Sequence, residues 1–163
     1  MAFIDIDNDS DDPTTITFYN VNDSVGSGGK NNTEDVKVVQ FFLKRAYLTD
    51  ELKNGKTWGE MVPDGKCGPI TNSWIRKFQI DCNRLGNNTL VDGLIDKANN
   101  PQNNRIGSIS QTNYTIRLLN NLLRHLDKEV YKNLTTHREV PPDLKLIFLQ
   151  IQSQGPKMDF GKN

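Results

Sequence analysis

The sequence has no long apolar stretch and no secretory leader. Its densest apolar segment, residues 144–149, is interrupted by Lys145, whereas a membrane-spanning helix needs about 20 consecutive apolar residues. Its first residues lack the basic start, the apolar stretch and the small-residue cleavage site of a signal peptide. We therefore expect no membrane span and a chain that is cytoplasmic as synthesised. Reaching the periplasm or a target cell would require export by a non-Sec route.

Metal ligands are also scarce. The two cysteines, Cys67 and Cys82, form no Cys-x-x-Cys pair, and the two histidines, His125 and His137, form no His-x-x-x-His pair. A zinc site needs three or four such ligands, so we predict no metal and no other cofactor. A helix over residues 70–84 would separate its start from Cys82 by about 18 Å, against about 7 Å for a disulfide, so we also predict free thiols.

No pattern of catalytic residues is evident. A cysteine nucleophile needs a neighbouring histidine to lower its pKa. Cys67 precedes a helix start, where thiolates are favoured, but its flanking residues do not resemble those of cysteine transpeptidases. A glycosidase needs two carboxylates across a cleft, and Glu51 with Glu60, or Asp64 with Asp92, have the required chemistry. Acids at such positions are more often turn or surface residues, so we expect a protein that is not an enzyme.

Basic and acidic side chains balance overall, with 20 of each. The balance is uneven, because residues 1–12 hold five aspartates and no base, which leaves the rest of the chain with a surplus of five positive charges. This surplus is small and contains no run of five Lys or Arg, so it predicts no nucleic-acid surface. A mildly anionic polymer would suit such a chain better.

Apolar residues that recur at three- and four-residue steps predict two helices in the first half of the chain. The first covers residues 34–48, with Thr33 as its N-cap. The second runs from about Ile70 to Gly86. Its inward stripe should consist of Ile70, Trp74, Phe78 and Cys82.

Two further helices are expected in the C-terminal third. One starts near Ser110 or Thr112 and runs to about Asn133, either as a continuous helix or with a break. Its inward face, the strongest periodic signal in the chain, comprises Leu119, Leu122, Leu123, Leu126, Val130 and Leu134. The other lies between Pro142 and Gly155, since proline suits the first turn of a helix and glycine its end. Its apolar residues Leu144, Ile147, Phe148 and Ile151 have helical spacing, which favours a helix over the alternative of a strand.

The remaining segments carry weaker signals. Residues 16–21 are rich in β-branched and aromatic side chains and predict one short strand without an evident partner. Residues 1–15 alternate aspartate with small or apolar residues but lack the spacing of an EF-hand loop, so we expect a frayed acidic tail. Residues 49–63 have too few periodic apolar positions for a long element and indicate a connecting excursion.

Several short motifs follow one another in a distinctive order. They are the glycine-rich loop 24–29, residues 35–40 with Leu43, the run Asp64-Gly65-Lys66-Cys67-Gly68-Pro69-Ile70-Thr71, Ile75 with Phe78-Gln79, and Asp92-Gly93. In this order they make residues 24–98 resemble the peptidoglycan-binding-domain family, a small three-helix module appended to bacterial and phage cell-wall enzymes. The resemblance implies a mainly α fold, a three-helix peptidoglycan-binding-like bundle with an N-terminal extension and additional C-terminal helices.

The same resemblance suggests how the chain is divided and what it binds. Residues 1–23 would form an acidic N-terminal extension with a short strand, residues 24–100 the peptidoglycan-binding-like domain, and residues 101–163 a helical extension. The implied function is a non-catalytic module that binds peptidoglycan or a muropeptide. A wall-binding groove needs an aromatic platform and oriented donors and acceptors. The candidate ligand-binding residues at or near the two Asp-Gly turns are Trp58, Asp64, Lys66, Asn72, Arg76 and Asn88.

Two other functions are compatible with the sequence. Because no secretory leader is present, the chain could be a protein-docking component, cargo or accessory of a contractile, type VI-like secretion system. Its partner would then be a secretion-apparatus protein. The chain could also be the targeting part of a wall hydrolase or of a phage lysin.

Overall fold

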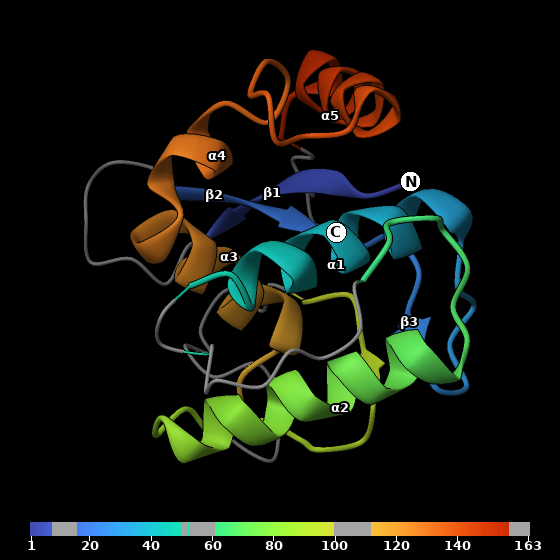
Figure 1. Cartoon of the computed structure of the whole chain (residues 1–163), viewed down its shortest axis with the longest axis vertical. Coiled ribbons are helices and arrows are strands. Elements are labelled where there is room, and N and C mark those ends of the chain that lie inside the picture. Colours follow the sequence, from blue (N-terminus) through green and yellow to red (C-terminus); the bar gives the residue numbers. More distant parts are fainter. Residues whose placement is uncertain (8–15, 50–51, 53–60, 100–111, 157–163) are drawn as a thin grey trace, which may run out of the picture.

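The computed structural model describes residues 1–7, 16–49, 52, 61–99 and 112–156. They form a mainly helical fold, as the sequence predicts (Figure 1). The helices are α1 (Thr33–Ala46), α2 (Pro69–Arg84), α3 (Thr115–Leu126), α4 (Lys128–Lys132) and α5 (Pro142–Gln154). The strands β1 (Phe3–Asp7) and β2 (Ile16–Asn20) form one antiparallel pair, and β3 (Val25–Gly26) and β4 (Leu94–Ile95) form another. None of the helices described is both long and apolar enough to span a bilayer.

The starts of two helices differ from the prediction. The N-cap of α1 is Asn32 rather than Thr33, and its side chain accepts a hydrogen bond from the backbone of the first turn. An amide oxygen at this position satisfies an N–H group that has no partner within the helix. The helix α3 begins at Thr115, later than the predicted start near Ser110 or Thr112, because the backbone just before Thr115 is extended. Ser110 itself lies outside the described residues.

The third predicted helix is divided into α3 and α4 by a break at Asp127. Arg45 of α1 fixes this break, because its Nε and Nη2 donate to the two carboxylate oxygens of Asp127 over 2.7 and 3.0 Å. Because of this break, the Val130 side chain of α4 points into the core, where it is almost fully buried. Leu122 and Leu126 were expected on the inward face, but Leu122 is only half-buried and Leu126 is exposed.

The inward stripe of α2 also differs at its first member. Trp74, Phe78 and Cys82 are buried as predicted, but Ile70 is 69% exposed. The inward position of this first turn is taken by Thr71, which is buried. Thr71 is polar, so its inward position could not be predicted from apolar periodicity.

The N-terminal residues form a strand rather than the expected frayed tail. Residues 3–7 are β1, which pairs with β2 in the register Phe3↔Asn20 to Asp7↔Ile16. This pairing supplies the partner that the predicted strand lacked, and it buries Phe3 and Phe18. Residues 3–7 contain two aspartates, which are uncommon in strands, so their alternation with apolar residues does not by itself predict a strand. The rest of the predicted tail, residues 8–15, and most of the predicted excursion 49–63 lie outside the described residues.

The outer edge of β2 is covered by a side chain of α3. The Asn120 amide accepts a hydrogen bond from Tyr19 N over 2.8 Å and donates one to Tyr19 O over 2.9 Å. Asn120 is completely buried, and the Tyr131 hydroxyl donates a further bond to its Oδ1 over 2.7 Å. The amide thus takes the place of a neighbouring strand, and it leaves this part of the sheet edge without unpaired backbone groups.

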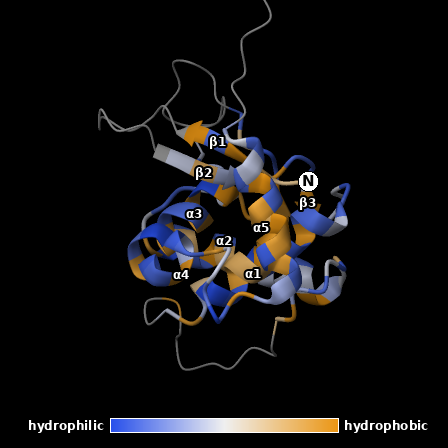
Figure 2. Ribbon diagram, turned by 90° about the horizontal axis from the view of Figure 1, so that it is seen from above, coloured by the Kyte–Doolittle hydropathy of each residue, from blue (hydrophilic) through white to orange (hydrophobic). Residues whose placement is uncertain are grey.

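One contiguous hydrophobic core joins the hairpin, the helices and the C-terminal part of the described chain. At its centre the rings of Phe42 (α1) and Phe148 (α5) are stacked with centroids 6.0 Å apart, and both meet Tyr19 of β2 edge to face. In Figure 1 the hairpin lies between α5 and α1, and α2 lies on the far side of α1. Figure 2 shows the hydrophobic residues of α1 and α5 toward the middle of the molecule.

The Asn120 contact gives a test of this arrangement. We expect Asn120→Ala to lower the free energy of unfolding by about 2–6 kcal/mol, because two buried backbone groups of Tyr19 lose their partners at about 1–3 kcal/mol each. Urea denaturation followed by circular dichroism measures this change. The control Asn121→Ala alters the adjacent exposed position and should change stability by less than about 0.5 kcal/mol. Equal effects of the two substitutions would contradict the role of Asn120.

Candidate functional site

A buried glutamine of α1 holds the first Asp-Gly turn. The Nε2 atom of Gln40 lies within hydrogen-bonding distance of Asp64 Oδ1 (3.1 Å), the Lys66 carbonyl (3.0 Å) and Thr71 Oγ1 (3.0 Å). Its Oε1 accepts a hydrogen bond from Gly65 N over 2.9 Å. Gln40 therefore ties α1 to the turn and to the first turn of α2, and we call this group the first clamp.

A second glutamine repeats the arrangement one helix later. The Nε2 atom of Gln79 on α2 lies near Asp92 Oδ1 (3.0 Å), the Leu94 carbonyl (2.9 Å) and Thr115 Oγ1 (3.2 Å). Its Oε1 accepts hydrogen bonds from Gly93 N over 2.8 Å and from Asp92 N. This second clamp ties α2 to its following turn and to the start of α3.

The two turns need their Asp-Gly sequences for the same reasons. In each, the aspartate Oδ1 accepts the N–H two residues later, from Lys66 over 2.9 Å and from Leu94 over 3.0 Å, which closes a tight turn. Gly65 and Gly93 have φ values of +79° and +74°, a region that glycine adopts without strain. At Gly65 a Cβ atom would also come within 2.6 Å of the Thr33 side chain.

The first clamp gives Asp64 a structural role. Hydrogen bonds from the Lys66 backbone and from Gln40 hold the pKa of its carboxyl below the usual range. The carboxylate is exposed at the surface but is already used within the turn. Asp92 has the same position in the second clamp, so the two acids considered as a glycosidase pair both serve their own turns.

The other predicted ligand-binding residues lie along α2. Lys66 is exposed in the first turn, and Arg76 is exposed one helical turn beyond Asn72. Asn72 is half-buried, and its Oδ1 accepts a hydrogen bond from Cys67 Sγ over 3.2 Å. These three residues therefore share the N-terminal half of α2 and the turn before it.

The remaining two candidates do not join this group within the described structure. Asn88 is exposed after the C-terminal end of α2, and its carbonyl accepts a hydrogen bond from Asn113 N over 2.7 Å. At about 1.5 Å per helical residue, the end of α2 is about 18 Å from Asn72. Trp58 lies outside the described residues.

A polar pocket of about 370 Å³ lies beside the second clamp, where three separate segments meet. Its lining residues are Asn22, Asp23, Ser24, Lys30, Asp96, Lys97, Asn99 and Tyr114. The segment that carries Lys97 and Asn99 is fixed by Asn20 of β2, whose amide bonds Ala98 N over 3.0 Å and Ala98 O over 2.8 Å. Sequence reasoning missed this pocket, because its residues are far apart in the chain and follow no periodic pattern.

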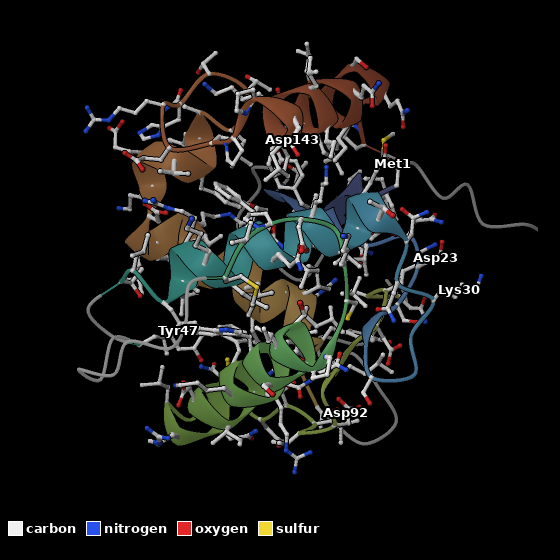
Figure 3. The ribbon with its side chains drawn as sticks, turned by 45° about the vertical axis from the view of Figure 1, so that its right-hand side comes forward. Met1, Asp23, Lys30, Tyr47, Asp92 and Asp143 are labelled. Atoms are coloured by element: carbon white, nitrogen blue, oxygen red, sulfur yellow. The ribbon has the colours of Figure 1, made fainter. Side chains whose placement is uncertain are left out.

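The charges of the pocket are unevenly paired. Asp23 forms an ion pair with Lys30 at 3.1 Å, which holds the pKa of the Asp23 carboxyl below its usual range (Figure 3). The Lys97 ammonium lies 5.1 Å from the centre of the Phe3 ring. Burial, together with the nearby Asp92, raises the pKa of the Asp96 carboxyl.

A charged cluster near the end of α1 is centred on the buried carboxylate of Asp81. The Asp81 carboxylate accepts hydrogen bonds from the Tyr47 hydroxyl at 2.6 Å and from Lys77 Nζ at 2.5 Å, and it pairs with Arg84 at 3.1 Å. Burial and the neighbouring Asp81 raise the pKa of Tyr47, which keeps its hydroxyl protonated as a donor. This cluster joins α1 to α2. The hydrogen bonds from Tyr47 and Lys77 both go to Asp81 Oδ2, while the buried Oδ1 makes no hydrogen bond to the described residues and lies 3.1 Å from Arg84 Nη2.

Both cysteines are free thiols, as predicted. Burial raises the pKa of Cys67 and raises that of Cys82 to about 12, which is opposite to the shift that activates a nucleophile. In the part of the chain that the structure describes, no group of three or more His, Cys, Asp or Glu side chains could hold a metal ion.

No protein-family model, curated protein or solved structure matches this chain.

Because the two clamps have the same arrangement, removing either glutamine should destabilise the fold to a similar degree. We expect Gln40→Ala and Gln79→Ala each to lower the free energy of unfolding by about 2–4 kcal/mol, because each leaves a buried glycine N–H and other turn groups unpaired. Urea denaturation gives the values. Gln150→Ala, at an exposed position of α5, is the control and should cost less than about 0.5 kcal/mol. A loss below about 1 kcal/mol for both clamp variants would contradict the structural role given to them.

Proposed function

We propose that this protein is a non-catalytic module that binds bacterial peptidoglycan. In this proposal α1 and α2 belong to the peptidoglycan-binding-like domain of residues 24–100, β1 and β2 to the N-terminal extension, and α3, α4 and α5 to the C-terminal helical extension. Because peptidoglycan lies outside the cytoplasm, the proposal includes transfer of the chain to the periplasm or to a target cell.

The observation that carries this proposal is the repeated clamp. The motif blocks on which the resemblance rests contain Gln40, Asp64-Gly65, Gln79 and Asp92-Gly93, and these residues build the two clamps. The resemblance therefore rests on residues whose hydrogen bonds hold the Asp-Gly turns against the helices. Scattered apolar positions, which many helical proteins share, would support it much less.

The best candidate face for the wall polymer is the N-terminal half of α2 with the turn before it. Lys66 and Arg76 are exposed there, and Asn72 lies beside the second Asp-Gly turn, with its carbonyl 3.8 Å from where a Gly93 Cβ would be. Peptidoglycan presents hydroxyls, amides and carboxylates. Cationic and amide side chains on one face suit these groups.

A second candidate function is a docking component or cargo of a contractile, type VI-like secretion system. It is favoured by the outer face of α5, where Leu146 and Leu149 are 64% and 55% exposed. Two large apolar side chains three residues apart on a helix are suited to contact with another protein. The two candidates differ in whether the purified protein binds the wall without help.

Retention on insoluble peptidoglycan tests the first proposal. We expect the purified protein to sediment with the polymer, and the double variant Lys66→Ala/Arg76→Ala to bind roughly 2- to 30-fold less, since each lost surface charge contact is worth about 0.2–1 kcal/mol. The control Lys128→Ala/Lys132→Ala removes two exposed charges from α4 and should sediment like the unaltered protein. A protein that stays in the supernatant would contradict peptidoglycan binding.

A further inference from the structure

One charged group in the polar pocket has no partner among the described residues. Asp23 is paired with Lys30, and the Lys97 ammonium faces the Phe3 ring. The Asp96 carboxylate, in contrast, makes no hydrogen bond or ion pair within the described structure. Asp96 is exposed overall, but its carboxylate loses part of its hydration at the pocket wall and no cation among the described residues offsets that loss, which agrees with the raised pKa of this group. A cationic ligand would relieve this cost.

The other lining residues of the pocket indicate which class of ligand it would bind. Asn22, Asn99 and Ser24 offer amide and hydroxyl groups that suit peptide N–H and C=O groups. Lys97, which follows Asp96 directly, offers a positive charge to a carboxylate. Opposite charges side by side, with amides around them, match a peptide end that carries both an ammonium and a carboxylate group better than a neutral glycan.

The size of the pocket agrees with a small ligand. Sites for small molecules have volumes of about 300–1,000 Å³, and about 370 Å³ is at the lower end of this range. The walls are held by backbone contacts on two sides, from Asn20 to Ala98 and from Gln79 to Leu94. The pocket is therefore formed before any ligand arrives.

We infer that this pocket binds a short peptide at a free ammonium group, with Asp96 as the acceptor and Lys97 facing the peptide carboxylate. The stem peptides of peptidoglycan, which contain a diamino acid, have this chemistry. That the peptide comes from the wall rests on the proposed function. The pocket would then bind the stem peptide, and the N-terminal half of α2 would contact other parts of the polymer.

Calorimetric titration of the full chain tests this inference with three probes. The first is the stem tripeptide N-acetyl-alanyl-isoglutaminyl-lysine, in which the lysine side chain is the one free ammonium group. The second is the same tripeptide acetylated on that side chain, and the third is an N-acetylglucosamine oligomer. We expect binding of the first probe, and a loss of about tenfold or more on acetylation, because a charge-assisted hydrogen bond is removed.

Asp96→Asn should weaken binding of the free tripeptide by a similar factor and leave the thermal unfolding temperature nearly unchanged, since Asp96 is exposed. Glu129→Gln removes one exposed acid on α4 and should bind like the unaltered protein. Equal binding of the acetylated tripeptide, an unchanged affinity in Asp96→Asn, or no binding of the tripeptide would overturn the inference.

The outcomes separate this inference from the proposed function. A protein that is retained on insoluble peptidoglycan but does not bind the tripeptide keeps the proposed function and loses the pocket assignment. Tripeptide binding that depends on Asp96, in a protein that peptidoglycan does not retain, keeps the pocket assignment and removes the wall as its source. Binding of the glycan oligomer alone would also overturn the pocket assignment.

Discussion

A buried side-chain amide must find partners for its polar atoms, and two such amides determine how this protein folds. Gln40 and Gln79 meet this demand by bonding an Asp-Gly turn and the threonine that follows it on the next helix. Each clamp therefore joins three consecutive parts of the chain. Because the Leu94 carbonyl belongs to the second clamp, the pairing of β4 with β3 and the position of Asp96 depend on it too.

The same device attaches the outer parts of the molecule. Asn120 bonds both backbone groups of Tyr19 and so fixes the hairpin to α3, and Asn20 does the same for Ala98 and so fixes the pocket segment to β2. Hydrophobic packing brings these elements together, but it has no strong directional preference. The directional hydrogen bonds of the four amides fix how the elements are oriented, and two of them, from Asn20 and Gln79, hold the segment that carries Asp96 and Lys97.

The parts of this fold that sequence reasoning predicted are those with a local signal. Apolar periodicity predicts α1, α2 and α5, and the Asp-Gly pairs predict the two turns. Long-range pairing has no such signal, so the partner of β2 was missed, and Thr71 rather than Ile70 faces inward because a polar contact decides its orientation. The proposed pocket could not be predicted from the sequence for the same reason, since its residues near 22, 97 and 114 come together only in the folded chain.

Amide hydrogen exchange measured by NMR tests the central claim most directly. The N–H groups of Gly65 and Gly93 lie in turns outside the helices, yet both donate to buried glutamine oxygens. If the clamps hold the fold together, both amides should exchange as slowly as the best protected helical amides, and Gln79→Ala should accelerate exchange at Gly93 before it affects Gly65. Exchange of both amides at the rate of exposed loop residues in the unaltered protein would contradict this account.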